Sequence, residues 1–279
     1  EAISAIPVWG WREELVEILD VEQEQVKSLS AGTILNTEEI VVNDFQAKYI
    51  AMFPSGDVDA MVPKNLSNPL RIGFSKFLKE HSDPVAFLTS KLQMTTDELE
   101  KSFNAEQLDA LCLGIWNFER GDGFINGDMG GKGKGRFLAG MIRYGIIHNK
   151  PPVFMTNKKD LFHDIYRDLK DIGSEHLLNP FIVNGSSSPI MNGTTLVHRT
   201  PDKLVKEHIE KDTVPDANVF FCTYSQISRV PAPKYKALDD GTEKKYNVNK
   251  AHWLAKAAAG GILLADESHE MSGASNTNV

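Results

Sequence analysis

The chain has 279 residues, 41% of them hydrophobic and 24% charged, with a net charge of −8. This is the composition of a folded globular protein with a sizeable core. Its two cysteines, Cys112 and Cys222, exclude a disulfide framework and a multi-cysteine zinc site. No apolar run approaches the roughly 18 residues of a membrane span, so we expect no membrane contact. Residues 1–60 hold 12 acidic and 3 basic side chains, and the overall acidity argues against strong non-specific DNA binding.

The first third of the sequence is predicted to be mostly helical. Apolar side chains recur at helical spacing over residues 11–29. Two further helices are expected at 69–81 and 83–92, the second with Asp83 as N-cap and Pro84 at the first helical position. We therefore expect an acidic, mostly helical accessory region over residues 1–95.

A second domain is expected over residues 96–279, beginning with a helix at 104–118. From residue 123 onward, short apolar runs alternate with helical patterns, which is typical of an α/β fold with a mainly parallel sheet. The expected strands lie at 123–126, 153–156, 181–183, 219–223 and 261–265, and the expected helices at 135–148, 159–172, 201–211 and 249–259. Proline and glycine between residues 225 and 250 indicate a long excursion.

A glycine-rich stretch at 127–136, Gly-Asp-Met-Gly-Gly-Lys-Gly-Lys-Gly-Arg, is the densest chemical signal. It follows an apolar run and precedes a helical pattern, which is the strand–loop–helix context of a phosphate-binding loop. Glycines let backbone N–H groups turn toward phosphates, and Lys134 would neutralise their charge. Gly135 stands where a Ser or Thr usually contacts magnesium. The alternative interpretation is a flexible Gly/Lys surface loop.

A second signal is an apolar strand that ends in two adjacent carboxylates, Asp266 and Glu267. In a P-loop ATPase, the first such carboxylate holds magnesium and the second polarises the attacking water. The strand would place both at its carboxyl end, where open α/β sheets bind ligands. The alternative is a solvated acid pair at a strand end.

Lys134 together with the Asp-Glu-Ser-His sequence at 266–269 resembles motifs I and II of superfamily 2 helicases of the DExH type. The sequence is most similar to the strawberry notch helicase-like family, in which Gly-Asp before the loop and Gly-Lys-Gly-Arg at its end are usual. The resemblance covers roughly residues 49–279. Further matching stretches lie at 62–66, 106–110, 167–169, 171–173, 223–225 and 266–277.

The resemblance implies a RecA-like P-loop NTPase domain, with a mainly parallel β-sheet flanked by helices, that uses ATP and Mg²⁺. Lys134 and Glu267 would be the catalytic residues, with Glu267 as general base. Asp266 would hold Mg²⁺, mainly through water, and His269 would couple the ATP state to a second domain. The loop residues expected to bind ATP are Asp128, Met129, Gly130, Gly131, Lys132, Gly133, Lys134, Gly135 and Arg136.

Gln107 is similar to the glutamine that reads the adenine edge in these helicases. Asn104 and Gln107 also form a helix-capping pattern, and one residue can serve both purposes. For Arg136 we favour a side chain that extends over the sheet above one that reaches phosphate.

Polar residues after two of the expected strands are candidates for nucleic-acid contact. Asn157 and Lys158 follow the strand at 153–156, while Thr223 and Tyr224 end the strand at 219–223. In superfamily 2 enzymes such loops touch the nucleic-acid backbone. Ordinary polar chemistry at a strand end is the alternative.

The resemblance implies an ATP-dependent nucleic-acid motor, with DNA favoured over RNA because many members come from bacteria and phages. We then expect a cytoplasmic location in a bacterial or phage-infected cell, or a nuclear one in a eukaryote. The chain begins with Glu1 and stops shortly after motif II, so we expect it to be a piece of a longer product that lacks its second RecA-like domain. The competing hypothesis is a catalytically weak P-loop scaffold or protein-interaction module.

Overall fold

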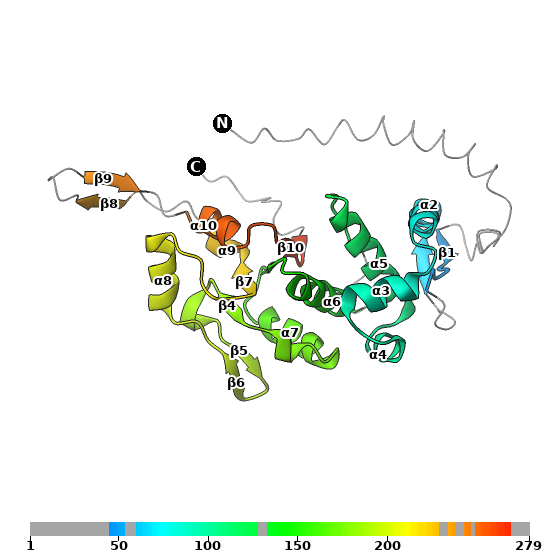
Figure 1. Ribbon diagram of the computed structural model, residues 1–279, viewed down its shortest axis with the longest axis horizontal. Helices are drawn as coiled ribbons and strands as arrows, with labels where there is room; N and C mark the ends of the chain where they lie inside the picture. Colours follow the sequence, from blue (N-terminus) through cyan, green and yellow to red (C-terminus); the bar gives the residue numbers. More distant parts are fainter. Residues whose placement is uncertain are drawn as a thin grey trace. The chain divides into compact units, whose positions relative to one another are not determined.

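The computed structural model describes residues 45–53, 60–127, 133–228, 234–237, 243–246 and 249–268 (Figure 1). The helix expected at residues 11–29 lies outside them. The chain falls into two compact units, Glu1–Ile50 with Asp59–Lys76 and Ala51–Val58 with Phe77–Val279. The domain boundary after residue 95 stays a prediction.

The described part of the first unit is a short antiparallel pair and most of a long helix, whose last four residues belong to the second unit. Strand β1 (Gln46–Lys48) pairs with β2 (Met61–Pro63), and α2 (Lys64–Glu80) follows directly. Helix α2 begins five residues before its predicted start, and Pro69 lies inside it. The predicted start at Pro69 was based on the preference for proline at the first helical position. Pro69 instead lies in the interior of α2, where it lacks the N–H for one backbone hydrogen bond.

Three helices form the start of the second unit: α3 (Pro84–Leu92), α4 (Thr96–Ser102) and α5 (Ala105–Glu119). The Asp83 side chain caps α3 as predicted, accepting from the Ala86 backbone N–H at 2.9 Å. Helix α4 is not predicted from sequence, because its seven residues include a single buried one, Leu99, and so carry no helical periodicity.

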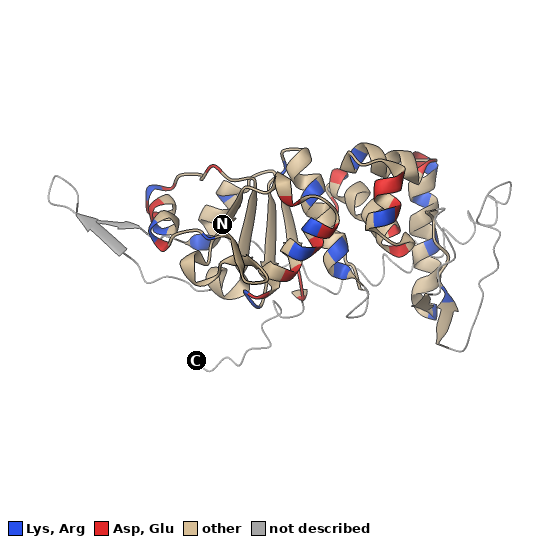
Figure 2. Ribbon diagram, turned by 90° about the horizontal axis from the view of Figure 1, so that it is seen from below, with Lys and Arg blue, Asp and Glu red and all other residues tan. Residues whose placement is uncertain are grey.

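A four-stranded parallel sheet is the centre of this unit. Its order is β10 (Ile262–Ala265), β3 (Pro152–Thr156), β7 (Val219–Thr223) and β4 (Pro180–Ile182). None of these strands carries a charged residue, and Figure 2 shows them in tan among helices that carry blue and red segments. The α/β fold with a mainly parallel sheet is therefore confirmed.

Helices cover both faces of the sheet, and alternate strand residues face opposite layers. Phe154 and Phe221 pack against Phe162 of α7 (Leu161–Asp171), which lies beside α6 (Lys134–Ile147) (Figure 1). The other face packs on α8 (Asp202–Lys211) and α10 (Lys250–Ala257), through Val153, Met155, Phe220, Cys222, Val205, Ile209, Trp253 and Leu254. Burial on both faces explains why the strands read as unbroken apolar runs.

Several short elements differ from the sequence predictions. Residues 122–127 form no strand, and Ile125 is 90% exposed. A strand needs a hydrogen-bonded neighbour, and among the described residues the outer side of β10 has none. The turn-rich parts of the chain contain unpredicted elements: the hairpin β5 (Ile190–Asn192) with β6 (Thr195–His198), α9 (Tyr224–Ile227), the hairpin β8 (Lys234–Ala237) with β9 (Glu243–Tyr246), and the 3₁₀ turns η1 (Glu175–Leu177) and η2 (Gly185–Ser187).

No helix in the described part of the chain is both long and apolar enough to span a membrane.

Candidate nucleotide-binding site

The amino end of α6 presents Lys134 as its first helical residue. Gly133, the N-cap, has a left-handed backbone with φ of 83°, which favours glycine. Its carbonyl accepts a hydrogen bond of 3.2 Å from Gln107 Nε2, and a Cβ built on Gly133 would overlap that nitrogen. The expected phosphate-binding residues just before it, Asp128, Met129, Gly130, Gly131 and Lys132, lie outside the described residues.

The carboxyl end of β10 presents the two acids. The Asp266 backbone N–H donates to the Met155 carbonyl at 2.8 Å, which extends the β10–β3 pairing past the strand end. Glu267 follows with a left-handed φ of 53°, a conformation that is uncommon for a non-glycine residue and often found at functional sites. Its Oε1 lies 3.8 Å from Lys134 Nζ. The fold therefore brings together the lysine and the acid that were expected to form one site.

Negative charge accumulates at this strand end. Burial raises the pKa of Asp266, and the adjacent Glu267 raises it further, while Lys134 acts in the opposite direction. Burial, followed by the charges of both acids, also raises the pKa of Tyr224 to about 12. An added cation would lower the energy of the ionised carboxylates, so the site electrostatically favours a metal ion.

A cavity of about 670 Å³ opens beside these side chains. Lys134, Asp266, Glu267 and Ser268 line one side of it, while β10, the segment 122–127, Gly114 and Phe118 of α5, and Phe137, Leu138 and Met141 of α6 line the rest. Its volume falls within the range typical of small-molecule sites, and an apolar wall with a few converging charges is their usual character.

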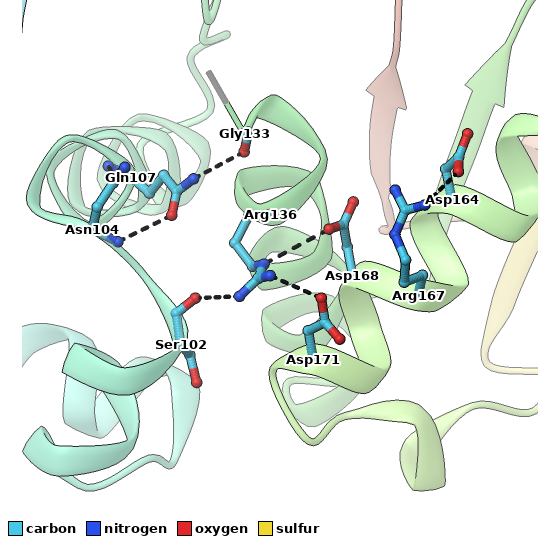
Figure 3. A network of polar contacts seen from close by, with 9 residues as sticks. All are labelled: Ser102, Asn104, Gln107, Gly133, Arg136, Asp164, Arg167, Asp168 and Asp171. Carbon is cyan, nitrogen blue, oxygen red and sulfur yellow. Dashed lines mark hydrogen bonds and ion pairs between the residues drawn. The ribbon is translucent and has the colours of Figure 1, made fainter. Parts of the chain in front are cut away.

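The residues that follow Lys134 face α7 (Figure 3). A Cβ built on Gly135 would overlap Asp168 Oδ2 of α7. Arg136 donates from Nη1 to the Ser102 carbonyl at 2.7 Å, and its Nη2 lies 2.9 Å from Asp171 Oδ2. Its Nε lies 3.7 Å from Asp168 Oδ1. The Arg136 guanidinium thus joins the end of α4, α6 and α7; a phosphate contact by Arg136 stays a prediction.

The Gln107 amide has both of its polar atoms bonded within the protein (Figure 3). Its Oε1 accepts from the Asn104 backbone N–H at 3.0 Å, and its own backbone N–H donates to Asn104 Oδ1 at 3.0 Å, which completes a capping box on α5. The Nε2 bond to Gly133 connects α5 to the glycine-rich loop. The proposed adenine contact stays a prediction.

The four nucleic-acid candidates have different surroundings. Thr223 is buried and bonded to Asn184, and the Tyr224 hydroxyl donates to the Asp266 carbonyl. Asn157 Oδ1 is buried and has no hydrogen-bond partner within the described residues. Lys158 is exposed and forms no ion pair with a described residue. Within the described part of the chain, Asn157 and Lys158 thus have polar groups without a protein partner, while nucleic-acid contact by Thr223 and Tyr224 stays a prediction.

His269, expected to couple the nucleotide state to a second domain, lies outside the described residues.

Asp168 of α7 lies next to the lysine loop, beside Gly135, and the sequence interpretation did not single it out. Its side chain is 18% exposed, and burial raises the pKa of its carboxyl, while Arg136 opposes that shift. The only signal in the sequence was its place in the stretch at 167–169 that matches the strawberry notch family, which assigns no role.

The donor set fits Mg²⁺ bound together with a nucleotide. Among the described residues, no group of three or more His, Cys, Asp or Glu side chains could hold a metal ion unaided. Magnesium is usually bound through one or two carboxylates plus substrate phosphates and water, not by an all-protein cage. Asp266, whose raised pKa reports uncompensated negative charge, is suited to that role.

The comparison with protein families decides the assignment. The model of the P-loop containing NTP hydrolase pore-1 family matches residues 79–279. The chain belongs to this family. Its fold is accordingly the RecA-like α/β fold of P-loop NTPases, with nucleotide binding as the shared property of the family.

Similarity to curated proteins identifies it further as a strawberry notch-type P-loop domain. The strawberry notch homolog 1 protein of Gallus gallus is 32% identical over 213 residues, which cover 68% of this chain and 15% of the relative. The Homo sapiens protein of the same name is 37% identical over 82 residues, 27% of this chain and 6% of the relative. The chain thus matches less than a sixth of the length of these relatives. No solved structure matches it significantly.

Proposed function

We propose that this chain is the ATP-binding and hydrolysing half of a helicase-like nucleic-acid motor. The observation that carries the proposal is the approach of Lys134 Nζ to within 3.8 Å of Glu267 Oε1, which unites the P-loop lysine with the acid pair after β10. The cavity beside them and the family match over residues 79–279 support the same interpretation.

The side chains divide the chemistry of ATP hydrolysis among them. Lys134, at the amino end of α6, neutralises the β- and γ-phosphates, aided by the helix dipole. Asp266 holds Mg²⁺ through water, and Glu267 accepts the proton of the attacking water as general base. Bound Mg²⁺ supplies charge neutralisation on the phosphate oxygens. In this structure Lys134 Nζ lies 3.8 Å from Glu267 Oε1, and this ion pair opens when Lys134 turns to phosphate.

Fast turnover is expected to need a second RecA-like domain. In this class of enzymes the second domain provides an arginine finger, which is worth about 10³–10⁵ in rate. Nucleotide binding is thus the property to test first, and turnover is expected to rise when a second RecA-like domain is supplied.

Binding of a fluorescent ATP analogue, with and without Mg²⁺, tests the proposal directly. We expect wild type and Glu267→Gln to bind, and Lys134→Ala to lose roughly 10- to 100-fold in affinity, because a charge-assisted contact to phosphate is removed. Lys203→Ala, an exposed lysine on α8 on the opposite face of the sheet, is the matched control and should bind like wild type. Absence of binding by wild type at millimolar nucleotide would favour the competing hypothesis of a P-loop scaffold.

Asn157 and Lys158 are the proposed contacts to the nucleic-acid backbone. Both residues follow β3, and no described residue pairs with Asn157 Oδ1 or with the Lys158 cation, which supports this assignment. Single-stranded DNA and RNA of equal length and sequence, compared by fluorescence anisotropy, decide which polymer is preferred. The preference for DNA and the bacterial or phage origin stay predictions, and the vertebrate relatives lend no support to that origin. Lys158→Ala should weaken binding of either polymer, and no change would contradict the assignment.

A further inference from the structure

Gly135 leaves the P-loop without one of its usual metal contacts. In P-loop proteins a Ser or Thr follows the lysine, and its hydroxyl contacts Mg²⁺. Gly135 occupies that position in the first turn of α6 and has no side-chain atom to offer. If the chain binds Mg²⁺ with ATP, as proposed above, another group must supply this contact or the ion is held less firmly.

An oxygen from α7 already occupies the space that the missing side chain would fill. A Cβ built on Gly135 would overlap Asp168 Oδ2, so a Ser or Thr could not fit here while Asp168 keeps its conformation (Figure 3). Gly135 and Asp168 are therefore complementary. Gly135 has no side chain, and Asp168 Oδ2 lies where a Ser or Thr side chain at position 135 would begin.

The contacts of the α7 acids single out Asp168. Asp164 and Asp171 each have a cationic nitrogen within 3.0 Å, from Arg167 and Arg136 respectively. The cation nearest to Asp168 is Arg136 Nε, 3.7 Å away on the Oδ1 side. No described residue donates a hydrogen bond to Asp168 Oδ2. That oxygen lies at the first turn of α6 with its acceptor capacity unused by any part of the chain that the structure describes, although the Asp168 side chain is only 18% exposed.

The chemistry of Asp168 suits a divalent cation. Carboxylate oxygens are hard donors of the kind that Mg²⁺ prefers, and a carboxylate brings a full negative charge where a hydroxyl brings only a dipole. Burial raises the pKa of the Asp168 carboxyl despite the nearby arginines, which means that its charge is incompletely compensated in the protein alone.

We propose that the Asp168 carboxylate replaces the missing P-loop hydroxyl as a ligand of the nucleotide-bound Mg²⁺, directly or through one water. This inference rests on the proposed function, because it needs Mg²⁺ to arrive with ATP next to Lys134. It assigns a role to the Gly-Lys-Gly sequence of this loop: Gly135 leaves room for an oxygen from another helix.

Reciprocal substitution tests the proposal with metal binding as the readout. Fluorescent ATP-analogue binding is titrated with Mg²⁺ in the full 279-residue chain, and Mn²⁺ bound with ATP is followed by electron paramagnetic resonance. Asp168→Ala should raise the Mg²⁺ concentration for half-maximal binding about 10- to 100-fold, the range seen when a supporting metal contact is removed. Nucleotide binding in excess EDTA should be unaffected.

The double variant Gly135→Ser with Asp168→Ala restores a hydroxyl and removes the overlap. We expect it to recover most of the lost Mg²⁺ affinity. Gly135→Ala with Asp168→Ala is the matched control, since it fills the same space without an oxygen and should not recover. Equal recovery in both double variants would show that Asp168 only fills space, and would overturn the proposal.

If Asp168→Ala does not fold, Asp168→Asn can be used instead, because it keeps the shape of the side chain. It should also raise the Mg²⁺ concentration for half-maximal binding, because the amide lacks the charge. The Mn²⁺ spectrum of the ATP complex should change as well. A Mg²⁺ titration identical to that of wild type would overturn the proposal. Lys134→Ala distinguishes failure of the Asp168 proposal from failure of the proposed function. If wild type binds nucleotide and Lys134→Ala does not, the proposed function stands, whatever the Asp168 variants show.

Discussion

Glycines stand on both sides of Lys134. At each of them, a polar side chain from a neighbouring helix fills the space that a Cβ atom would take. Gln107 of α5 occupies the space beside Gly133, and Asp168 of α7 occupies the space beside Gly135. The absence of a Cβ at both positions therefore has a packing reason in addition to the conformational one at Gly133. Both neighbours carry groups that can act on a nucleotide or its metal ion, which places them among the residues to test first.

Gln107→Glu separates the capping role of Gln107 from its role at the loop. Glutamate is as good a capping-box residue as glutamine, so the free energy of unfolding should change by less than about 0.5 kcal/mol. The Nε2 donor to the Gly133 carbonyl is lost, so ATP-analogue affinity should fall roughly three- to tenfold. Asn104→Ala is the converse control, since it should lower stability and leave the donor in place. Unchanged affinity in Gln107→Glu would reduce Gln107 to a helix cap.

Asp266→Asn should stabilise the nucleotide-free protein at neutral pH. The folded state raises the pKa of Asp266 above its ordinary value of 3.8, so stability falls as the pH rises from that value through the folded pKa, and the full penalty remains at higher pH. The asparagine variant lacks this charge. Its advantage in urea midpoint should therefore be largest near pH 7 and shrink as the pH falls toward 4.

The control for this pH series is Asp216→Asn, a substitution at an exposed acid remote from β10, which should show no such gain. When Mg²⁺ and the ATP analogue are added, wild type should become more stable than Asp266→Asn, because the charged carboxylate attracts the metal ion and the amide does not. A variant that is less stable than wild type at every pH would contradict the sign of the effect.

At the scale of elements, the joint between α4, α6 and α7 depends on Arg136. Its guanidinium donates to the Ser102 carbonyl and pairs with Asp171 and Asp168 (Figure 3). Because α6 carries Lys134 and α7 carries Asp168, this joint also fixes how the two stand relative to each other.

Arg136→Met should lower the free energy of unfolding by about 1–3 kcal/mol, because a carbonyl and two carboxylates lose their shared donor. Arg167→Met is the matched control on α7. Its pair with Asp164 is exposed on both sides, so its loss should cost less than about 1 kcal/mol. Urea unfolding at pH 7 measures both variants, and equal losses would show that Arg136 is an ordinary surface arginine.

The elements also show where sequence patterns suffice. Four of the five expected strands and the helices between them are present, because burial on both faces gives each strand an apolar run that stands out from its surroundings. The run at 123–126 looked the same in sequence and forms no strand, since pairing depends on a neighbour that a local pattern does not reveal. The hairpin β5–β6 was missed because its strands are short and half polar.

Sequence patterns likewise predict some residues of the candidate site and not others. Lys134, Asp266 and Glu267 could be predicted, because motif I and motif II occur at recognisable positions in an α/β sequence. Asp168 could not, since its proposed role rests on the approach of α7 to Gly135, and nothing in the local sequence encodes that contact.

At the scale of the whole molecule, the charge is unevenly distributed along the chain. Residues 1–44 hold ten acidic and two basic side chains, so they account for the entire net charge of −8. Residues 45–279, which carry the P-loop domain and the proposed nucleic-acid contacts, are neutral overall. An acidic segment on the same chain repels a polyanion and competes with it for cations such as Lys158.

A chain of residues 45–279 should therefore bind single-stranded nucleic acid more tightly than the full chain. We expect a roughly two- to tenfold difference at low salt that shrinks above about 0.15 M, where the screening length falls below about 8 Å. A full-length variant with the acids of residues 1–44 changed to amides keeps the segment and should behave like the shorter chain. If the amide variant binds like wild type while the shorter chain binds more tightly, the segment acts by its bulk and not by its charge. Equal affinity of all three chains at every salt concentration would remove the acidic segment from any control of nucleic-acid binding.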